Sequence, residues 1–341
     1  GPNSGTQADD HFNIVLYTGN GSTQSITGVG FQPDWTWLKR RNGATSHRLM
    51  DSSRTAAKYL SSDTSNAEDV TSGIFASFDT DGFSLNGTAN AFNGNTNTYV
   101  GWNWKANGGT TSSDSNGSIT STVQANQKAG FSIVLYTGTG SNATVGHGLS
   151  TAPDVVLVKG RSNSSRFWTY WGTQFVNTSY IYLNTTDGED TGGATITNST
   201  YPSSTVFSIG TSVFVNGSSE TYVAYCFHEV EGYSKFGSYT GNGSTDGAFI
   251  YLGFRPAWVL IKRTDTGGHD WMLVDNTREP FNPMDDTLFP SANTSELSGD
   301  ASDHLSNGFK HRSTGASENA SGGTYIYLAF AEAPFKYANG R

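Results

Sequence analysis

The chain has 341 residues, of which 14% are charged and 13% are aromatic, and its net charge is −9. This length suits two or three domains, and the abundance of Gly, Ser, Thr and Asn favours short strands and tight turns over helices. The acidic balance argues against nucleic-acid binding. No apolar run approaches the ~20 residues of a membrane span, so we expect a soluble protein without membrane insertion.

Residues 1–10, "GPNSGTQADD", resemble the remnant of a cleaved purification tag, and we expect this start to be disordered. The stretch has no apolar segment typical of a secretion signal. The single cysteine, Cys226, excludes an intrachain disulfide and a multi-thiolate metal site. We therefore expect stability to come from packing, and we expect no cofactor.

One phrase recurs three times along the chain, as "FNIVLYTGNGS", "FSIVLYTGTGS" and "KFGSYTGNGS". Each copy continues with a strand-like run after a proline and closes with a Thr-Tyr pair and an aromatic strand. A repeat of about 100 residues predicts three domains of one design. We place them at residues 11–106, 130–231 and 232–341.

The first copy contains eight strand-like runs in chain order, separated mostly by Gly, Asn and Asp. They are "NIVLYTG", "SITGVGF", "DWTWLKRR", "HRLMDS", "KYLS", "GIFASFD", "GFSLNG" and "TYVGWNWK". Short strands without a helical period indicate an all-β fold. We expect three tandem antiparallel β-sandwich modules, jelly-roll-like in design.

The connections between the copies differ in composition. Residues 107–129 are rich in Gly, Ser and Thr and predict an extended or flexible linker. Copies two and three are joined only by "EVEGYSK", which predicts that they are docked against each other. We therefore expect the first copy to be the more mobile one.

Comparison among the copies separates structural from variable positions. Trp102 and Trp104 alternate along the closing strand and have large apolar equivalents, so we assign them to a core, with Cys226 as a small filler on the opposite face. "DSSR" from Asp51 and "DNTR" from Asp275 predict an ion pair that braces a turn, where copy two has "WGTQ". "FDTDGFSLNG" predicts a hairpin turn rather than a calcium loop.

The candidate ligand-binding residues are aromatics without an aromatic counterpart in the other copies. Tyr170 and Trp171 lie beside Arg166 in a loop-flanked stretch, and Trp37 belongs to a second variable set. Exposed rings can stack on the apolar faces of sugars. The seven histidines have no metal-ligand spacing, and no nucleophile or phosphate-binding motif is present, so we expect neither a catalytic nor a metal site.

Several phrases together resemble a repeat module of virion proteins of tailed bacteriophages, particularly marine ones. They include "YTGNGS", "GFQPDWTWLKRR", "TYVGWNWKA", "EGYSKFGSYTGNGS" and "YIYLAFAEAPFKYANGR", and the resemblance extends from His11 to Arg341. It implies a location in the virus particle, as a tail fibre, tail spike or other appendage. The lone thiol agrees with assembly in the host bacterial cytoplasm.

The expected function is non-enzymatic recognition of, or adhesion to, a bacterial surface glycan, with other virion proteins as further partners. Repeated weak sites on one chain raise avidity. The chain could form a homotrimer, or the three copies could make a pseudo-threefold monomer. Two alternatives stay open: a purely structural virion protein, either a head decoration or a tail component, and a polysaccharide depolymerase, which needs two facing carboxylates.

Overall fold

The computed structural model describes residues 7–332, without the side chains of residues 300 and 301, and nearly all of its regular structure is β-strand. The strands pair antiparallel in every sheet of the described residues, which confirms the all-β class. Part of the expected disordered start, residues 1–6, and the end of the expected third repeat, residues 333–341, lie outside the described residues. The 3-10 helix η1 (Ala8–Asp10) falls in the rest of that start, where Ala8 is buried.

The first segment, residues 12–104, contains two main sheets. The larger has the order β1 (Phe12–Thr18), β9 (Thr98–Trp104), β3 (Trp35–Arg40) and β4 (Arg48–Asp51). The smaller has the order β2 (Gln24–Thr27), β8 (Gly82–Leu85) and β7 (Phe75–Asp79), and β5 (Lys58–Tyr59) pairs with β6 (Asp69–Val70). Val15 and Leu38 from the larger sheet share one apolar cluster with Phe83 and Leu85 from the smaller. This burial of apolar surface holds the two sheets together.

The second segment, residues 131–227, has a wider larger sheet. Its order is β10 (Ser112–Asp114), β11 (Ser121–Asn126), β12 (Phe131–Thr137), β18 (Thr221–Phe227), β14 (Val155–Gly160), β15 (Thr169–Gly172) and β16 (Ile181–Tyr182). The smaller sheet pairs β13 (Ala143–Gly146) with β17 (Val206–Ile209), and the segment also contains the one-turn helices α1 (Ala194–Thr197) and α2 (Val213–Asn216).

The third segment, residues 234–331, follows the plan of the first. Its larger sheet has the order β19 (Ser234–Thr240), β26 (Thr324–Ala331), β21 (Pro256–Arg263) and β22 (Met272–Asp275). Its smaller sheet has the order β20 (Phe249–Tyr251), β25 (Gly308–His311), β24 (Leu297–Leu305) and β23 (Met284–Thr287). All three larger sheets thus place the closing strand between the opening strand and the strand after the proline.

The eight runs expected in the first copy are all strands in the structure, namely β1, β2, β3, β4, β5, β7, β8 and β9. Residues 107–129 are not the free linker that their composition predicts. This stretch supplies β10 and β11 to the second segment's sheet. Its few apolar residues suffice for this, since Val123 is 5% exposed and packs into that segment's own core.

The repeated opening phrase has a structural cause. The opening and closing tyrosines stack in every segment, with ring centroids 4.9 Å apart for Tyr17 and Tyr99, and each opening hydroxyl donates to a backbone carbonyl at 2.7 Å. A buried asparagine holds the turn that follows. In the first segment, Asn93 donates to the carbonyl oxygens of Ser22 and Gly87. Asn216 and Asn319 do the same in the other segments.

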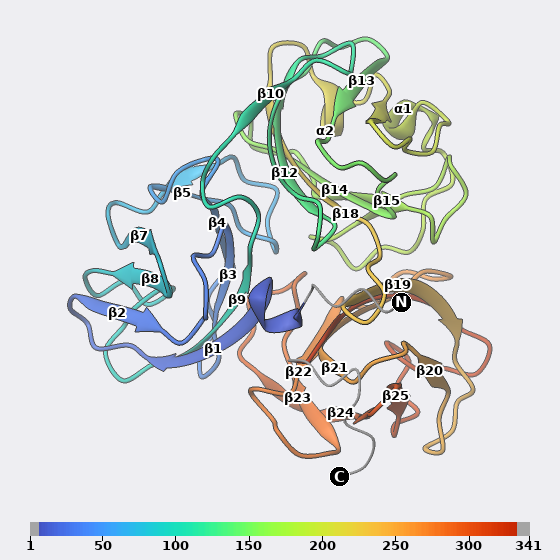
Figure 1. Ribbon diagram of the computed structural model, residues 1–341. Coiled ribbons are helices and arrows are strands. Elements are labelled where there is room, and N and C mark those ends of the chain that lie inside the picture. The colour runs from blue at the N-terminus through green and yellow to red at the C-terminus, as the bar shows by residue number, and fades with distance from the viewer. Residues whose placement is uncertain (1–6, 333–341) are drawn as a thin grey trace.

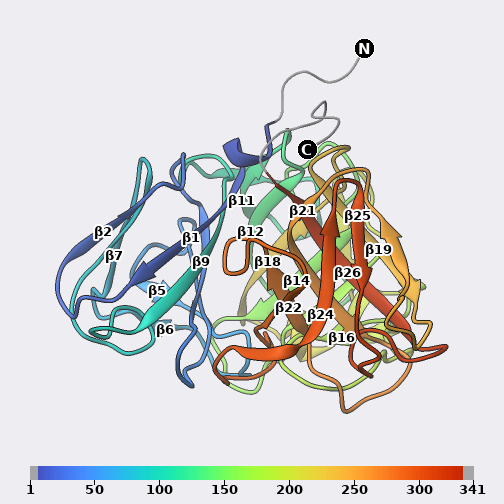
Figure 2. The ribbon, with the colours of Figure 1, turned by 90° about the horizontal axis from the view of Figure 1, so that it is seen from below.

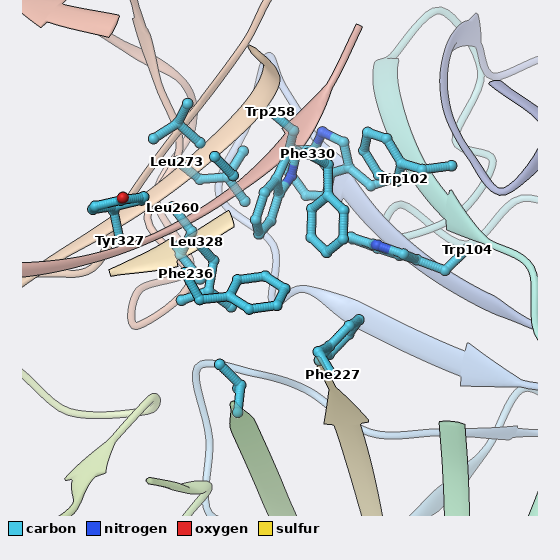
Figure 3. Close-up of a cluster of buried hydrophobic side chains, with 14 of the residues drawn as sticks. Trp102, Trp104, Phe227, Phe236, Trp258, Leu260, Leu273, Tyr327, Leu328 and Phe330 are labelled. Atoms are coloured by element: carbon cyan, nitrogen blue, oxygen red, sulfur yellow. The ribbon is translucent and has the colours of Figure 1, made fainter. Parts of the chain in front are cut away.

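The three segments surround a common centre (Figure 1), and the view from below shows the first segment beside the other two (Figure 2). One apolar cluster contains buried residues of all three. In Figure 3 the rings of Trp104, Phe227 and Phe330 converge from the three closing strands. Phe330 lies 5.7 Å from Trp104 and 5.8 Å from Phe227 between ring centroids. This confirms the core assignment of Trp104, and it gives the first segment the same anchoring as the others.

A buried ion pair joins the first segment to the second. Arg54 contacts Asp51 at 2.5 Å, and neither side chain is exposed. From the second segment, Tyr225 donates its hydroxyl hydrogen to Asp51 Oδ2 at 2.6 Å. Arg54 also contacts Glu68, which Arg161 of the second segment holds at 2.8 Å. The expected ion pair is therefore present, and it connects two segments in addition to bracing its turn.

The third segment meets the first in the same way. Arg278 contacts the buried Asp275 at 2.6 Å, and Trp102 of the first segment donates its indole N–H to Asp275 Oδ2 at 3.0 Å. Glu296 bridges Arg278 to Arg41 of the first segment, at 2.7 and 2.8 Å.

Of this charged group, the described residues at the interface between the second and third segments keep the glutamate, as Glu189, but not the buried Asp–Arg pair. Val155 pairs with Gly172 as Trp35 pairs with Asp51, so the equivalent of "DSSR" is "GTQF" from Gly172 and not "WGTQ". At this interface Gly172 stands in place of the aspartate, and Phe175 stands in place of the arginine that pairs with it. Leu328 replaces the aromatic hydrogen-bond donor, and Thr264 replaces the second arginine. The apolar members of this set are buried, so packing takes the place of the ion pair.

Candidate functional site

The aromatic residues expected to bind a ligand lie in the protein interior. Trp37, Tyr170 and Trp171 are 2%, 2% and 3% exposed. Strand alternation explains this, because Tyr170 points into the central cluster and its neighbour Trp171 into the second segment's own core. The premise that these rings are exposed is therefore wrong, and a ligand role for them has no surface to support it.

Arg166 is already engaged within its own segment. Its guanidinium binds the Glu220 carboxylate in a bidentate pair, with N–O distances of 2.7 and 2.5 Å. The hydrogen bond from Arg166 lowers the pKa of Glu220. The structure brings Arg166 to Glu220 and not to a cluster with Tyr170 and Trp171.

Two aromatic side chains stand exposed side by side on strand β20. Phe249 is 45% exposed and Tyr251 is 63% exposed, while Ile250 between them is buried. Since successive side chains of a strand point to opposite faces, both rings lie on the outer face of the smaller sheet, about 7 Å apart along the strand. They form a two-ring surface at a sheet edge.

The rings are specific to the third segment. Ile250 pairs with Phe309 as Ile26 pairs with Phe83 and Val145 with Phe207, which aligns the three strands. The small residues that stand in place of the two rings in the other segments are Ser25 and Thr27, and Thr144 and Gly146. The fold therefore does not require aromatics here, and internal alignment of "QSIT", "ATVG" and "AFIY" is the signal that could have found them.

Charged side chains of both signs adjoin the rings. Lys310 lies opposite Phe249 in the sheet and contacts Asp246 at 2.5 Å. On the next strand, Asp303 lies opposite Lys310 and binds Arg312 at 2.6 Å. The hydrogen bond from Lys310 lowers the pKa of Asp246. The group is balanced in charge, with hydrogen-bond donors and acceptors that are at least partly exposed.

Gly308 lies directly opposite Tyr251 and carries no side chain. A Cβ atom at this position would come within 2.0 Å of the Ile250 carbonyl oxygen, so the close backbone approach requires glycine. Position 308 therefore contributes no side chain beside Tyr251, which is 63% exposed. We call Phe249, Tyr251, Lys310, Asp303, Asp246 and Arg312 the aromatic face.

The aromatic face has the chemistry of a binding surface for polyhydroxylated molecules. Its rings can stack on apolar C–H faces, and its charged groups can exchange hydrogen bonds with hydroxyls. The charged groups are bound to one another in ion pairs, which suits binding more than proton transfer.

One acidic group could in principle attract a cation. Glu279, Asp285 and Asp286 place carboxylate oxygens within 4.8 Å of one another. However, Glu279 Oε2 already accepts the backbone N–H groups of Asp285 and Asp286 at 2.5 and 3.0 Å. These hydrogen bonds explain why the three side chains lie together, since Glu279 braces the turn that contains Asp285 and Asp286. The hairpin expected at Asp79 is confirmed by the pairing of that residue with Gly82.

Two histidines are buried away from any such site. His304 and His311 are each 1% exposed, and burial lowers their pKa values to about 4 and about 3. His311 packs 5.2 Å from Tyr239 and 5.6 Å from Phe309 between ring centroids. Among the described residues its ring nitrogens have no hydrogen-bond partner.

Because these two histidines are buried, we predict that the protein loses stability in mild acid. An unfolded histidine binds a proton near pH 6.5, whereas His311 in the fold resists protonation down to about pH 3. Between these values the unfolded chain binds more protons, so the free energy of unfolding falls as the pH falls, by up to about 1.4 kcal/mol per pH unit for each histidine. Above pH 6.5 this contribution is fully present.

The test is urea unfolding of the wild type and His311→Phe between about pH 7 and pH 4. The variant is expected to lose one histidine's share of the slope, about 1.4 kcal/mol per pH unit. Phe309→Leu serves as the control, since it changes the same core without removing a titrating group and shifts stability equally at every pH. An unchanged slope in His311→Phe would contradict this account.

Comparison with known proteins places the chain in a family. A family model described as "Domain of unknown function (DUF7483)" matches residues 7–334. No curated protein and no solved structure matches the chain. Across residues 7–332, none of the helices has the length and apolar character needed to span a membrane.

Proposed function

Because the chain belongs to the DUF7483 family, whose description states no activity, we propose its function from the aromatic face: recognition of a glycan on the surface of a host bacterium. In this proposal the protein is a non-enzymatic virion appendage of a tailed bacteriophage, of the tail fibre or spike type. The observation that carries the proposal is the exposed pair Phe249 and Tyr251, at 45% and 63% exposure, where the other segments have small residues.

The architecture supports this role. We interpret the three segments as tandem β-sandwich modules of one jelly-roll-like design, packed into a closed ring around a shared core. Such a frame holds surface side chains in fixed positions, which lowers the entropy cost of binding. The closed ring favours a single chain with pseudo-threefold symmetry over a homotrimer.

The resemblance of the repeated phrases to phage virion proteins supports the setting. The single cysteine is buried and unpaired, as expected for a protein assembled in a reducing cytoplasm. We propose that the protein is assembled in the host bacterial cytoplasm and acts as part of the virion.

Glycan binding is expected to depend on both rings. The variant Phe249→Ser with Tyr251→Thr installs the residues that the first segment carries at these positions, so the fold should tolerate it. Loss of two stacking rings is expected to weaken binding at least about tenfold, since central aromatic contacts commonly contribute more than 1 kcal/mol each. The measurement is binding of the wild type and the variant to a bacterial-glycan array, followed by titration of the strongest hit.

Tyr201→Ser is the matched control, since Tyr201 is an aromatic with 48% exposure on the second segment. It should bind like the wild type. Equal binding by the double variant would remove the aromatic face from the proposal, and absence of any glycan binding by the wild type would refute glycan recognition itself.

A purely structural role in the virion is the second candidate, and one observation favours it. The outer edge of β1 pairs with no strand among the described residues. An open strand edge is a place where another polypeptide can add a strand.

A further inference from the structure

Within the described residues, the outer edge of the opening strand is covered by another strand in the second segment and open in the first. In the second segment β11 covers the edge of β12, and Gln124 pairs with Ile133 and Thr122 with Leu135. In the first segment β1 is the last strand of its sheet on that side, within residues 7–332. The two opening strands align residue by residue, since Phe12 opposes Trp104 as Phe131 opposes Phe227. Ile14 is therefore the equivalent of Ile133.

Leu16 of β1 is the residue type found on a covered opening strand and not the type found on an open one. Leu16 is 40% exposed, whereas its equivalent Leu135 is half-buried against the central core, on the strand that β11 covers. The third segment, whose opening strand β19 is also at a sheet edge, has Ser238 at this position. A polar residue is the ordinary choice at an uncovered edge. The first segment thus keeps the residue type of the covered edge.

A groove lies along this edge. It has a volume of ≈ 380 Å³ and is lined by Phe12, Asn13 and Ile14 of β1 and by Asn276 and Thr277 of the third segment, among others. It is continuous with the interface between the third and first segments. The carboxylate oxygen Oδ1 of Asp9, which also lines the groove, is buried and accepts no hydrogen bond from the described residues.

The corresponding place between the first and second segments is filled by Gln124 of β11. Its side-chain amide donates to the hydroxyls of Ser52 and Ser53 at 2.9 Å each. Its Oε1 accepts the backbone N–H groups of Asn107 and Gly109 at 3.0 and 2.8 Å. Ser52 and Ser53 follow Asp51 as Asn276 and Thr277 follow Asp275. The groove therefore occupies the position that the side chain of Gln124 fills in the related interface.

We propose that the outer edge of β1 binds an antiparallel strand from a partner polypeptide, with an amide side chain opposite Ile14 that enters this groove. The partner strand has the character of β11: alternating Ser, Thr and Val residues, a central Gln or Asn, and a hydrogen-bond donor that reaches Asp9. Main-chain hydrogen bonds supply the affinity and the amide in the groove supplies the register.

The backbone of β1 has the donors for this pairing. Lys105 donates its N–H to the His11 carbonyl, so the odd-numbered residues of β1 bond to β9 and the even-numbered N–H groups point to the free edge. One of these, the N–H of Ile14, donates to Asn13 Oδ1 at 2.8 Å. The second segment has Ser132 in place of Asn13, beside the covered edge. Asn13 therefore competes with an incoming strand for one donor.

The probe is a synthetic peptide with the sequence of residues 118–128, "SITSTVQANQK", and fluorescence anisotropy measures its binding to the full chain. Asn13→Ser frees the Ile14 donor and is expected to bind the peptide at least about threefold more tightly than the wild type. Leu16→Ser installs the residue of the third segment and is expected to bind at least about tenfold more weakly. A peptide with the Gln replaced by Glu should also bind more weakly, because its carboxylate would approach Asp9.

Hydrogen exchange on the complex distinguishes this site from the other sheet edges. Bound peptide should slow exchange at the amides of Ile14 and Leu16 and leave those of the odd-numbered residues of β1 unchanged. Absence of peptide binding in both the wild type and Asn13→Ser would overturn the proposal. Binding that leaves the Ile14 and Leu16 amides unprotected, or that Leu16→Ser does not weaken, would overturn it as well.

Discussion

The variant Asp51→Ala is expected to lower the free energy of unfolding by about 3–5 kcal/mol, because it leaves a buried guanidinium without its closest counter-ion. Burial has the largest single effect on the pKa of Arg54 and lowers it, but Asp51, Tyr225 and Glu68 together outweigh burial and the pKa is raised. The arginine keeps its charge when Asp51 is removed, because a guanidinium is not deprotonated in proteins and Glu68 still lies 3.1 Å away. The hydroxyl of Tyr225 loses its acceptor in the same variant. Equilibrium urea unfolding of the full chain measures the loss.

Glu220→Gln is the control for burial. It breaks the ion pair with Arg166, whose side chain is 15% exposed against 18% for Glu220. Such a pair near the surface is expected to contribute about 0.2–1 kcal/mol. If the two variants lost the same free energy, burial would not be what makes the Asp51 ion pair important.

The chain itself offers a replacement for this ion pair. The triple variant Asp51→Gly, Arg54→Phe and Tyr225→Leu copies three of the four replacements at the interface between the second and third segments and leaves Arg161 paired with Glu68. It is expected to be more stable than Asp51→Ala, because it removes the Arg54 guanidinium and does not leave a buried charge without its counter-ion. A triple variant as unstable as Asp51→Ala would show that the apolar set works only in its own interface.

The variant Trp35→Ala is expected to cost about 3–5 kcal/mol and to weaken two segments at once. Trp35 lies 4.5 Å from Trp104 in its own segment, and 4.3 Å from Tyr225 and 5.9 Å from Phe131 in the second, between ring centroids. Because the core is continuous, we expect one cooperative unfolding transition with a lower midpoint. Calorimetry and hydrogen exchange measure the two effects.

Phe207→Ala is the matched control for the shared core. Phe207 is fully buried, but its cluster belongs to the second segment and the β-strands that precede it. Trp35→Ala should speed exchange in both β9 and β18, whereas Phe207→Ala should act first on the second segment. Unchanged exchange in β18 of Trp35→Ala, or a separate transition for the first segment, would contradict a continuous core.

Much of the strand content was predictable because it is written in local patterns. Alternation of apolar and polar residues, bounded by Gly, Asn and Asp, located the eight strands of the first segment. Comparison of the closing strands correctly assigned Trp102 and Trp104 to a core and Cys226 to the opposite face. These assignments depend on residues within one strand and its repeats, where a period of two fixes which side chains share a face.

The candidate site was missed for a related reason. Tyr170, Trp171 and Trp37 differ from their equivalents, and difference alone was interpreted as exposure. In the structure another segment or another sheet covers each of these rings. The composition of residues 107–129 likewise suggested a free linker, although the edge of β12 offered it a sheet to join.

The sequence by itself determined the all-β class, the threefold recurrence of the opening and closing strands, and the side chains that share each strand face. Only the tertiary structure decided which faces another segment covers, how Asp51 and Asp275 meet their neighbours, and why Phe249, Tyr251 and Leu16 remain exposed. The physical reason is that strand periodicity is local, whereas burial of a face depends on residues distant in the chain that pack against it.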